Sequence, residues 1–242
     1  MSNSKTAIII PIKNFDKSKS RLSPFLNLEQ RKRLCLHLVS DLLDKISDLE
    51  RSETIIVTNE SINLPEKMKR KTVIINECEN KGVNNAISLA DSYIGKNNFE
   101  QSIVIPIDIP LLNLTDLEGI IDHSRKFKEG VCIVPSYRFD GTNLLLRKPH
   151  SVIQTSYDDN SFFNHLKKAL EKGIYVKIYN YGNFNSDVDN LEDIILVLRN
   201  YFFYNSMNRN SFCKNLECNM KYKNSNTINY LLDVLRNYHQ NC

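Results

Sequence analysis

The chain has 242 residues, of which 41% are hydrophobic and 25% charged, and its formal net charge is +4. These values are typical of a globular protein with one large or two small domains. No apolar run approaches the ~20 residues of a membrane span, and the N-terminus lacks the layout of a signal peptide, so we expect a cytoplasmic protein without a membrane partner. No basic stripe interleaved with aromatic residues indicates a nucleic-acid partner.

Apolar runs alternate with amphipathic patterns along most of the chain, which predicts an α/β fold. In chain order, the expected elements are strand Thr6–Pro11, helix Leu28–Leu49, strands Thr54–Thr58 and Thr72–Asn76, helix Asn84–Ile94, strand Ser102–Ile107, helix Thr115–Phe127, strands Val131–Pro135 and Thr142–Arg147, helix Asn160–Lys172, strand Tyr175–Tyr179 and helix Leu191–Asn200. Asn27 with Gln30, and Thr115 with Glu118, predict capping boxes at two helix starts. The alternation favours a mixed, mainly parallel sheet sandwiched by helices, with an antiparallel pair around Asp140-Gly141.

The composition changes near residue 200, where the chain becomes rich in Asn, Tyr and Lys. We therefore divide the chain into a core domain, residues 1–200, and a C-terminal appendage, residues 201–242. Within the appendage only Ile228–Tyr238 has helical spacing. That stretch can dock on the core or on a second subunit, which leaves a homodimer open, and we expect a chain ending near Asn200 to keep its chemistry.

A basic loop follows the first predicted strand and carries Lys13, Lys17, Lys19 and Arg21. Open α/β sheets bind their ligands at the carboxyl ends of strands, and the positive charge favours a polyphosphate. Most phosphate loops use glycine to bring backbone amides onto the ligand. No glycine precedes Gly82, so side-chain cations would have to bind the phosphates. A solvated basic loop is the alternative.

Acidic residues form two further elements. Asp108 follows a very apolar strand, and Asp187 and Asp189 are two residues apart. In an extended segment two such carboxylates lie on one side, where they repel each other by roughly 4 kcal/mol at ~4 Å and an effective dielectric of about 20. A divalent cation such as Mg²⁺ would neutralise them. Turn and surface carboxylates are the alternative.

Small polar residues occur at three other expected turns or helix starts. Gly82 allows close backbone approach to a ligand, and Asn84 has the amide groups needed to read a base edge. Thr142 follows a turn, and Ser161 opens a helix whose first amides could bind an anion. Helix capping explains Ser161 equally well, and His165 by itself is more typical of a packed or exposed helix residue than of a catalyst.

Taken together and in order, these motifs resemble the 2-phospho-L-lactate guanylyltransferase family, which includes phosphoenolpyruvate guanylyltransferases. The resemblance covers about residues 6–198 and rests on Pro11-x-Lys13, Lys19-Ser20-Arg21-Leu22, Gly82-x-Asn84-x-Ala86, Asp108-x-Pro110-Leu111-Leu112, Gly141-Thr142-Asn143, Ser161-Phe162-x-x-His165 and Asp187-Val188-Asp189. It implies a nucleotidyltransferase fold of the nucleotide-diphospho-sugar transferase kind and a role in making coenzyme F-420. The chain departs from the family pattern at Val83, where leucine is usual, and at Tyr157-Asp158-Asp159-Asn160, where the family has a glycine.

The resemblance also implies roles for single residues. GMP would pass from GTP to the phosphate of a small phospho-carboxylic acid, and pyrophosphate would leave. The implied catalytic residues are Lys13, Lys19, Arg21 and Asp108. The implied nucleotide-binding residues are Lys13, Lys17, Lys19, Arg21, Gly82 and Asn84. One or two Mg²⁺ would be held by Asp108, Asp187 and Asp189, and the acceptor's carboxylate by Thr142, the backbone of Asp158, and Ser161.

Two alternatives remain open from the residues themselves. A metal-dependent glycosyltransferase of related fold would also use an Asp-x-Asp pair, although that pair usually lies in mid-domain. A non-catalytic nucleotide-binding regulator is the second alternative. The choice of guanine rests on the resemblance alone, and the choice between 2-phospho-L-lactate and phosphoenolpyruvate stays open.

Overall fold

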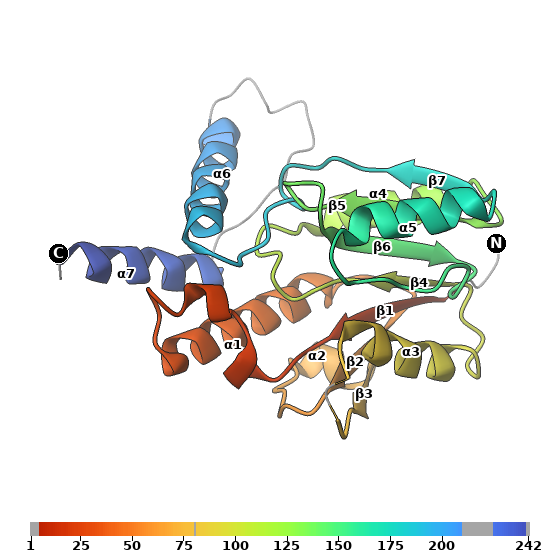
Figure 1. Ribbon diagram of the computed structural model, residues 1–242, viewed down its shortest axis with the longest axis horizontal. Helices are drawn as coiled ribbons and strands as arrows, with labels where there is room; N and C mark the ends of the chain where they lie inside the picture. Colours follow the sequence, from red (N-terminus) through yellow and green to blue (C-terminus); the bar gives the residue numbers. More distant parts are fainter. Residues whose placement is uncertain (1–4, 80, 210–224, 241–242) are drawn as a thin grey trace.

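The computed structural model describes residues 5–79, 81–209 and 225–240. Within these residues one seven-stranded sheet has the order β3-β2-β1-β4-β6-β5-β7 (Figure 1). The strands are β1 Thr6–Pro11, β2 Ser52–Thr58, β3 Thr72–Asn76, β4 Gln101–Val104, β5 Gly130–Pro135, β6 Thr142–Lys148 and β7 Tyr175–Ile178. β1 to β4 pair in parallel, β6 is antiparallel to β4 and β5, and β7 is parallel to β5. The mixed sheet and the antiparallel pair around Asp140-Gly141 are therefore confirmed.

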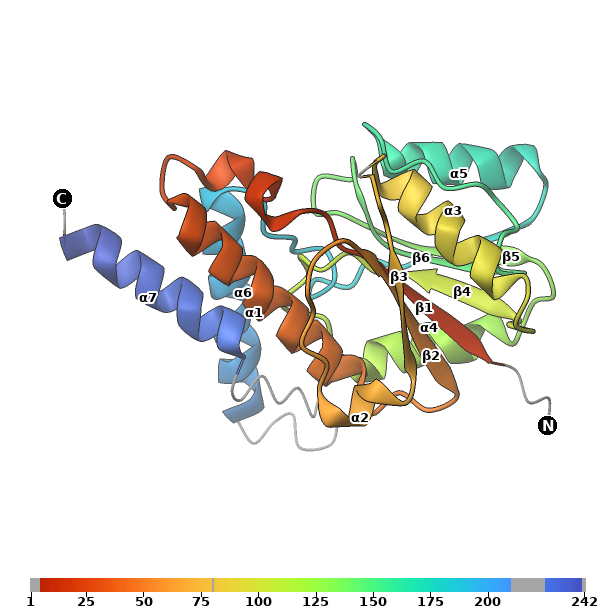
Figure 2. The same cartoon turned by 90° about the horizontal axis from the view of Figure 1, so that it is seen from below.

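Helices cover both faces of the sheet. They are α1 Leu28–Ile46, α2 Glu66–Lys69, α3 Val83–Ile94, α4 Leu114–Ser124, α5 Ser161–Glu171, α6 Leu191–Arg209 and α7 Asn226–Gln240. α3 and α5 pack on one face, and α1, α2 and α4 on the other (Figure 2). Every residue of β1 is buried, which explains its continuous apolar run. Over the described ranges, no helix has the length and apolar character needed to cross a membrane.

Side-chain caps set the starts of two helices. Asn27 and Gln30 form the predicted capping box at α1. The box predicted for Thr115 and Glu118 is wrong, because α4 begins one residue earlier and Asn113 is its N-cap. The Asn113 Oδ1 accepts the Asp116 N–H at 2.8 Å. A short amide side chain directly before the helix reaches this orphan donor, and Thr115 already lies inside the first turn.

Several element ends differ from the sequence expectation. β4 ends at Val104 rather than Ile107. Pro106 has no N–H to continue the ladder, which accounts for the early end. α1 ends at Ile46 rather than Leu49. α6 runs on to Arg209, so the expected boundary near residue 200 falls inside a helix.

The C-terminal helix α7 packs beside α1 (Figure 1). Its start is held by Asp41 of α1, whose Oδ2 accepts the Ser225 hydroxyl at 2.7 Å and the Thr227 N–H at 2.9 Å. Ile228 and Leu231 of α7 are fully buried in an apolar cluster shared with α1 and α6. The predicted helix in the appendage is thus docked on the core, while residues 210–224 of that appendage lie outside the described residues.

Candidate functional site

The loop after β1 is built from two short 3-10 turns, Phe15–Lys17 and Ser20–Leu22. Asn14 caps the first turn by accepting the Asp16 N–H at 2.8 Å. Lys19 begins the second turn with a left-handed φ of 54°. A non-glycine residue seldom adopts that conformation, so surrounding contacts must hold it there.

Those contacts are two carboxylates from distant parts of the chain. The Lys19 Nζ lies 2.8 Å from Asp108 Oδ2 and 2.9 Å from Asp189 Oδ1, and the Lys19 side chain is only 6% exposed. Burial alone would lower the pKa of Lys19, but the two carboxylates outweigh that effect and raise it above its ordinary value. Lys19 therefore stays charged and joins the basic loop to both predicted acidic elements.

Asp187 lies beside Asp108 and Asp189. Those two carboxylates are paired with Lys19, and that of Asp187 is not. Burial, together with the carboxylates of Asp108 and Asp189, raises the pKa of Asp187 to about 7. The ammonium of Lys19 instead lowers the pKa of Asp189. Val188, between them, is buried, and its N–H donates to the Asp108 carbonyl at 3.0 Å. The backbone thus fixes the Asp-x-Asp segment against the Asp108 loop.

A cavity of about 340 Å³ opens at the carboxyl ends of β1 and β4. Its lining includes five of the predicted site residues, namely Lys13, Lys17, Lys19, Asp108 and Asp189. Among the described residues, the predicted ones that do not line it are Arg21, Gly82, Asn84, Thr142, Asp158, Ser161 and Asp187. A slightly larger cavity of about 380 Å³ lies at the opposite, amino ends of these strands, beside Thr6 and Gln101, and no predicted residue lines it.

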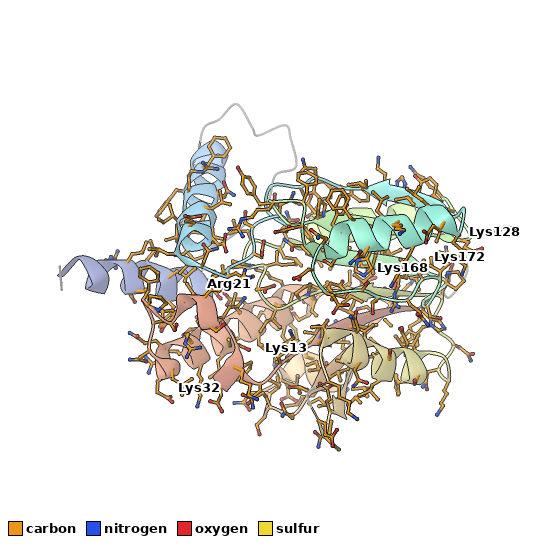
Figure 3. The ribbon with its side chains drawn as sticks, in the orientation of Figure 1. Lys13, Arg21, Lys32, Lys128, Lys168 and Lys172 are labelled. Atoms are coloured by element: carbon orange, nitrogen blue, oxygen red, sulfur yellow. The ribbon has the colours of Figure 1, made fainter. Side chains whose placement is uncertain are left out.

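Figure 3 shows the labelled basic residues in different parts of the molecule. Lys13 and Arg21 lie toward the middle of the molecule, on the side to which β1 leads. Lys128 and Lys172 lie at the far end of the sheet. Basic residues are therefore spread over the molecule, and those of the first loop lie beside the acidic elements, as does Arg138, whose charge acts on Asp189.

Thr142, Ser161 and His165 form a second, buried group. The Ser161 and Thr142 hydroxyl oxygens are 3.2 Å apart, and the Thr142 Oγ1 lies 3.0 Å from the His165 Nδ1. The His165 Nε2 accepts the Ser156 N–H at 2.8 Å. Burial lowers the pKa of His165 to about 3, so the ring is neutral. Of the packed and exposed alternatives that the sequence left open for His165, the structure shows the packed one.

The start of α5 presents backbone donors. Its N-cap, Asn160, has a left-handed φ of 59° and makes no side-chain capping bond. Capping by Asn160 therefore does not explain this segment. The first amides of α5, beginning at Ser161, lack a side-chain partner at the N-cap and suit an anion.

The structure gives Asn84 a different partner from the expected base edge. Its Oδ1 accepts the Tyr157 N–H at 2.8 Å, and its Nδ2 donates to Asp158 at 3.3 Å. Asn84 thereby joins the first turn of α3 to the segment before α5, and base reading by this side chain stays a prediction. Gly82, just before it, has φ 94°, a conformation that favours glycine.

Tyr157 is one of several lining residues that sequence reasoning did not assign to the site. It lines the cavity, and its ring meets the His165 ring edge-on with centroids 4.9 Å apart. It thus connects the cavity to the Thr142 group. A tyrosine before two aspartates matches no functional motif in the sequence, because its role depends on contacts with α3 and α5.

Comparison with known proteins identifies a matching family model and sequence relatives that are named 2-phospho-L-lactate guanylyltransferase. A family model described as "Guanylyl transferase CofC like" matches residues 6–234. The chain is 36% identical over 190 residues to 2-phospho-L-lactate guanylyltransferase of Methanocaldococcus vulcanius, covering 77% of this chain and 81% of that protein. It is 35% identical over 208 residues to the protein of the same name from Methanosphaera stadtmanae, covering 83% and 88%.

Solved structures agree on the fold. A protein described as a nucleotide-diphospho-sugar transferase from Desulfovibrio desulfuricans G20 superposes with a TM-score of 0.67 at 17% identity, covering 97% of this chain and 98% of that one. A cytidylyltransferase from Leptospira borgpetersenii superposes at 0.52 and 12% identity, covering 98% and 95%. The expected nucleotide-diphospho-sugar transferase-like fold is therefore confirmed. With the family model matching nearly the whole chain, this protein belongs to the guanylyl transferase CofC-like family.

Proposed function

We propose that this chain transfers GMP from GTP to the phosphate of 2-phospho-L-lactate and releases pyrophosphate. The observation that carries the proposal is the bridge from Lys19 to Asp108 and Asp189, which gathers cations and carboxylates in one cavity. It occurs in a chain whose relatives bear the name of that reaction. The reaction belongs to coenzyme F-420 biosynthesis, as the resemblance implies.

The basic loop would bind the triphosphate. Lys13 and Lys17 line the cavity and are exposed, so both can reach a ligand there. Lys19 is held in place by its two carboxylates. Arg21 lies near enough to Asp189 to lower the pKa of that carboxyl, which places its charge beside the same site. These cations would neutralise charge on the phosphates as pyrophosphate leaves.

Mg²⁺ fits the acidic side of the site. Burial, and then the neighbouring carboxylates of Asp108 and Asp189, raise the pKa of Asp187, and carboxylate oxygens are the ligands Mg²⁺ prefers. Within the described ranges, no three carboxylate, imidazole or thiolate groups converge closely enough to hold a metal alone. We therefore infer that Asp187 and Asp189, with Asp108 nearby, would share the ion with substrate phosphates. When bound, Mg²⁺ would stabilise charge on those phosphates.

The acceptor would bind at the second group. Thr142, Ser161 and the amides at the start of α5, with the Asp158 backbone beside them, would hold its carboxylate. Its phosphate would then face the α-phosphorus of GTP across Tyr157. A phosphate is a dianion near neutral pH and needs no general base, so positioning and charge neutralisation carry the step. A neutral, fully buried His165 agrees with that, because it cannot reach solvent to exchange a proton.

The two alternatives have less support. The glycosyltransferase shares the fold, since one structural relative is described as a nucleotide-diphospho-sugar transferase. However, the closely similar sequences are named guanylyltransferases and align over about four-fifths of the chain. A non-catalytic regulator does not require the paired carboxylates beside Lys19.

Turnover tests the proposal directly. The full chain, mixed with GTP, Mg²⁺ and 2-phospho-L-lactate, should release pyrophosphate and form a product with the mass of the guanylylated acid. EDTA should abolish the release, and added Mg²⁺ should restore it. ATP, CTP and UTP serve as matched nucleotides. Clear preference for CTP or ATP would refute guanine, and equal activity in EDTA would refute the metal. In a parallel assay with a nucleotide sugar as donor, sugar transfer without pyrophosphate release would favour the glycosyltransferase.

A further inference from the structure

A chain of hydrogen bonds runs from the backbone before α5 to the two hydroxyls of the second group. It passes from Ser156 through His165 and Thr142 to Ser161. Thr142 and Ser161 are each only 4% exposed, and His165 is fully buried. Among the described residues, the two hydroxyls have no hydrogen-bond partner other than each other and His165.

The direction of the first bonds follows from the donors. A backbone N–H can only donate, so the Ser156 N–H makes the His165 Nε2 an acceptor at 2.8 Å. A neutral imidazole carries one proton, which must then be on Nδ1. The Nδ1–H therefore donates to the Thr142 Oγ1, 3.0 Å away.

This direction leaves one hydroxyl proton without an acceptor. Thr142 and Ser161 have two O–H groups between them and share one bond of 3.2 Å. If Ser161 donates in that bond, the Thr142 proton is left over. If Thr142 donates, the Ser161 proton is left over. In both cases the pair presents one O–H donor, because His165 offers Thr142 a proton and does not accept one.

We propose that His165 is a positioning residue that makes the Thr142–Ser161 pair a hydrogen-bond donor toward an anion, and that this anion is the carboxylate of the acceptor acid. The proposal rests on the proposed function for the identity of the acceptor. A buried donor without an acceptor is costly, so a ligand that supplies one is favoured. The first amides of α5 lie beside Ser161 and are also donors, so the hydroxyl pair and these amides together favour an anion.

Two substitutions separate this role from simple packing. His165→Asn can place an amide N–H where Nδ1 lies, so it keeps the donor to Thr142 and loses the acceptor for Ser156. His165→Gln reaches the position of Nε2, so it keeps the acceptor for Ser156 and loses the donor to Thr142. The two variants are matched in chemistry and differ in which hydrogen bond survives. His165→Phe removes both and measures the full effect.

Steady-state kinetics with GTP and 2-phospho-L-lactate measure the outcome for each full-length variant. We expect His165→Gln and His165→Phe to raise KM for the acid by about 10- to 100-fold, which is the effect of losing one hydrogen bond to a charged group. KM for GTP should change less than twofold, and His165→Asn should restore most of the acid binding. Adding Thr142→Val to His165→Gln should cost less than Thr142→Val costs in the unsubstituted protein, because both changes break the same His165–Thr142 hydrogen bond.

Three outcomes of these measurements would contradict the role proposed for His165. Rescue by Gln and not by Asn would assign His165 to support of the Ser156 backbone and overturn the proposal. Equal increases in both KM values, or no change with Gln in a folded protein, would also overturn it. Circular dichroism and thermal melting identify a variant that fails to fold, and the pair of Asn and Gln keeps the comparison decisive. Failure of the proposed function is distinguishable, because the unsubstituted chain would then give no turnover with these substrates.

Discussion

Asp187 and Asp189 are two residues apart, yet their surroundings act on them in opposite directions. The pKa of Asp187 is raised to about 7 by burial and by two neighbouring carboxylates. The pKa of Asp189 is lowered, first by the charge of Lys19. In the absence of a cation, Asp187 is therefore a source of repulsion and Asp189 a partner in an ion pair.

Neutralising these residues should therefore affect stability in opposite directions. Asp187→Asn should raise the thermal midpoint at pH 8 without divalent cations, because it removes repulsion. Asp189→Asn should lower the midpoint, because buried Lys19 loses a partner. Both variants should lose turnover by about 10²-fold or more. Thermal melts with and without Mg²⁺ check this, and an Asp187→Asn variant that unfolds but keeps its specific activity would make that residue structural.

Lys13 offers a test of the phosphate site with little risk to folding, because it is exposed and lines the cavity. Lys13→Ala should raise KM for GTP by about tenfold, the effect expected for losing one charge-assisted hydrogen bond. Lys128→Ala is the matched control, since it removes an equal charge at the far end of the sheet (Figure 3). Equal effects of the two substitutions would mean that only net charge matters.

His165 should also make the protein sensitive to acid. The folded chain lowers its pKa from 6.5 to about 3, so the unfolded chain binds the proton first. Its contribution to stability is complete above pH 6.5 and is lost progressively as the pH falls toward 3. Between pH 7.5 and pH 5 the melting midpoint should therefore fall more for the unsubstituted protein than for His165→Gln. Parallel losses would show that other groups dominate acid unfolding.

Among the elements, α1, α6 and α7 together support the segments that carry the site. Their shared apolar cluster includes Leu22 from the basic loop, Leu111 from the Asp108 loop, and Val188 between the two aspartates. Ile228 and Leu231 of α7 fill the same cluster. The C-terminal helices thus lie directly behind the residues proposed to bind GTP and metal.

This packing argues against the expectation that a chain ending near Asn200 keeps its chemistry. Such a chain lacks Ile228 and Leu231. Truncating one buried aliphatic side chain lowers the free energy of unfolding by about 2–5 kcal/mol. We expect a lower thermal midpoint and a higher KM for GTP, measured by melting and kinetics.

Asp41→Ala isolates the attachment of α7. It removes the carboxylate that accepts the Ser225 hydroxyl and the Thr227 N–H, so it should produce a smaller shift in the same direction. Asp44→Ala, an exposed aspartate on the same helix, is the control. An unchanged melt and unchanged GTP binding in Asp41→Ala would show that the cap contributes nothing measurable.

At the scale of the molecule, the order of the strands explains where the cavity lies. From β1 the chain goes outward through β2 and β3, then returns to place β4 on the other side of β1. Ligands in open α/β sheets bind outside the carboxyl ends of the strands where the order reverses. Pro11 ends β1, Val104 ends β4, and both line the cavity.

The choice of acceptor also belongs to this scale, because it depends on the shape of the whole pocket. 2-Phospho-L-lactate and phosphoenolpyruvate share a carboxylate and a phosphate and differ at the carbon that bears the phosphate. Apolar contacts discriminate such differences by only ~1–3 kcal/mol. We expect both acids to be used, with 2-phospho-L-lactate favoured, in a competition assay that identifies products by mass. Use of phosphoglycerate alone would overturn the acceptor and leave guanylyl transfer standing.

The sequence by itself determined the order of the strands and of the helices other than the short α2, the antiparallel pair, and the segments that could carry chemistry. Hydrophobic periodicity and turn residues are local, so they could be predicted, as could the capping box of α1 but not the cap of α4. Long-range contacts could not. The pairing of Lys19 with Asp108 and Asp189, the bond of Asn84 to Tyr157, and the docking of α7 on Asp41 join residues far apart in the chain. Burial and neighbouring charge then set the states of Asp187 and His165, and both arise only when the chain is folded.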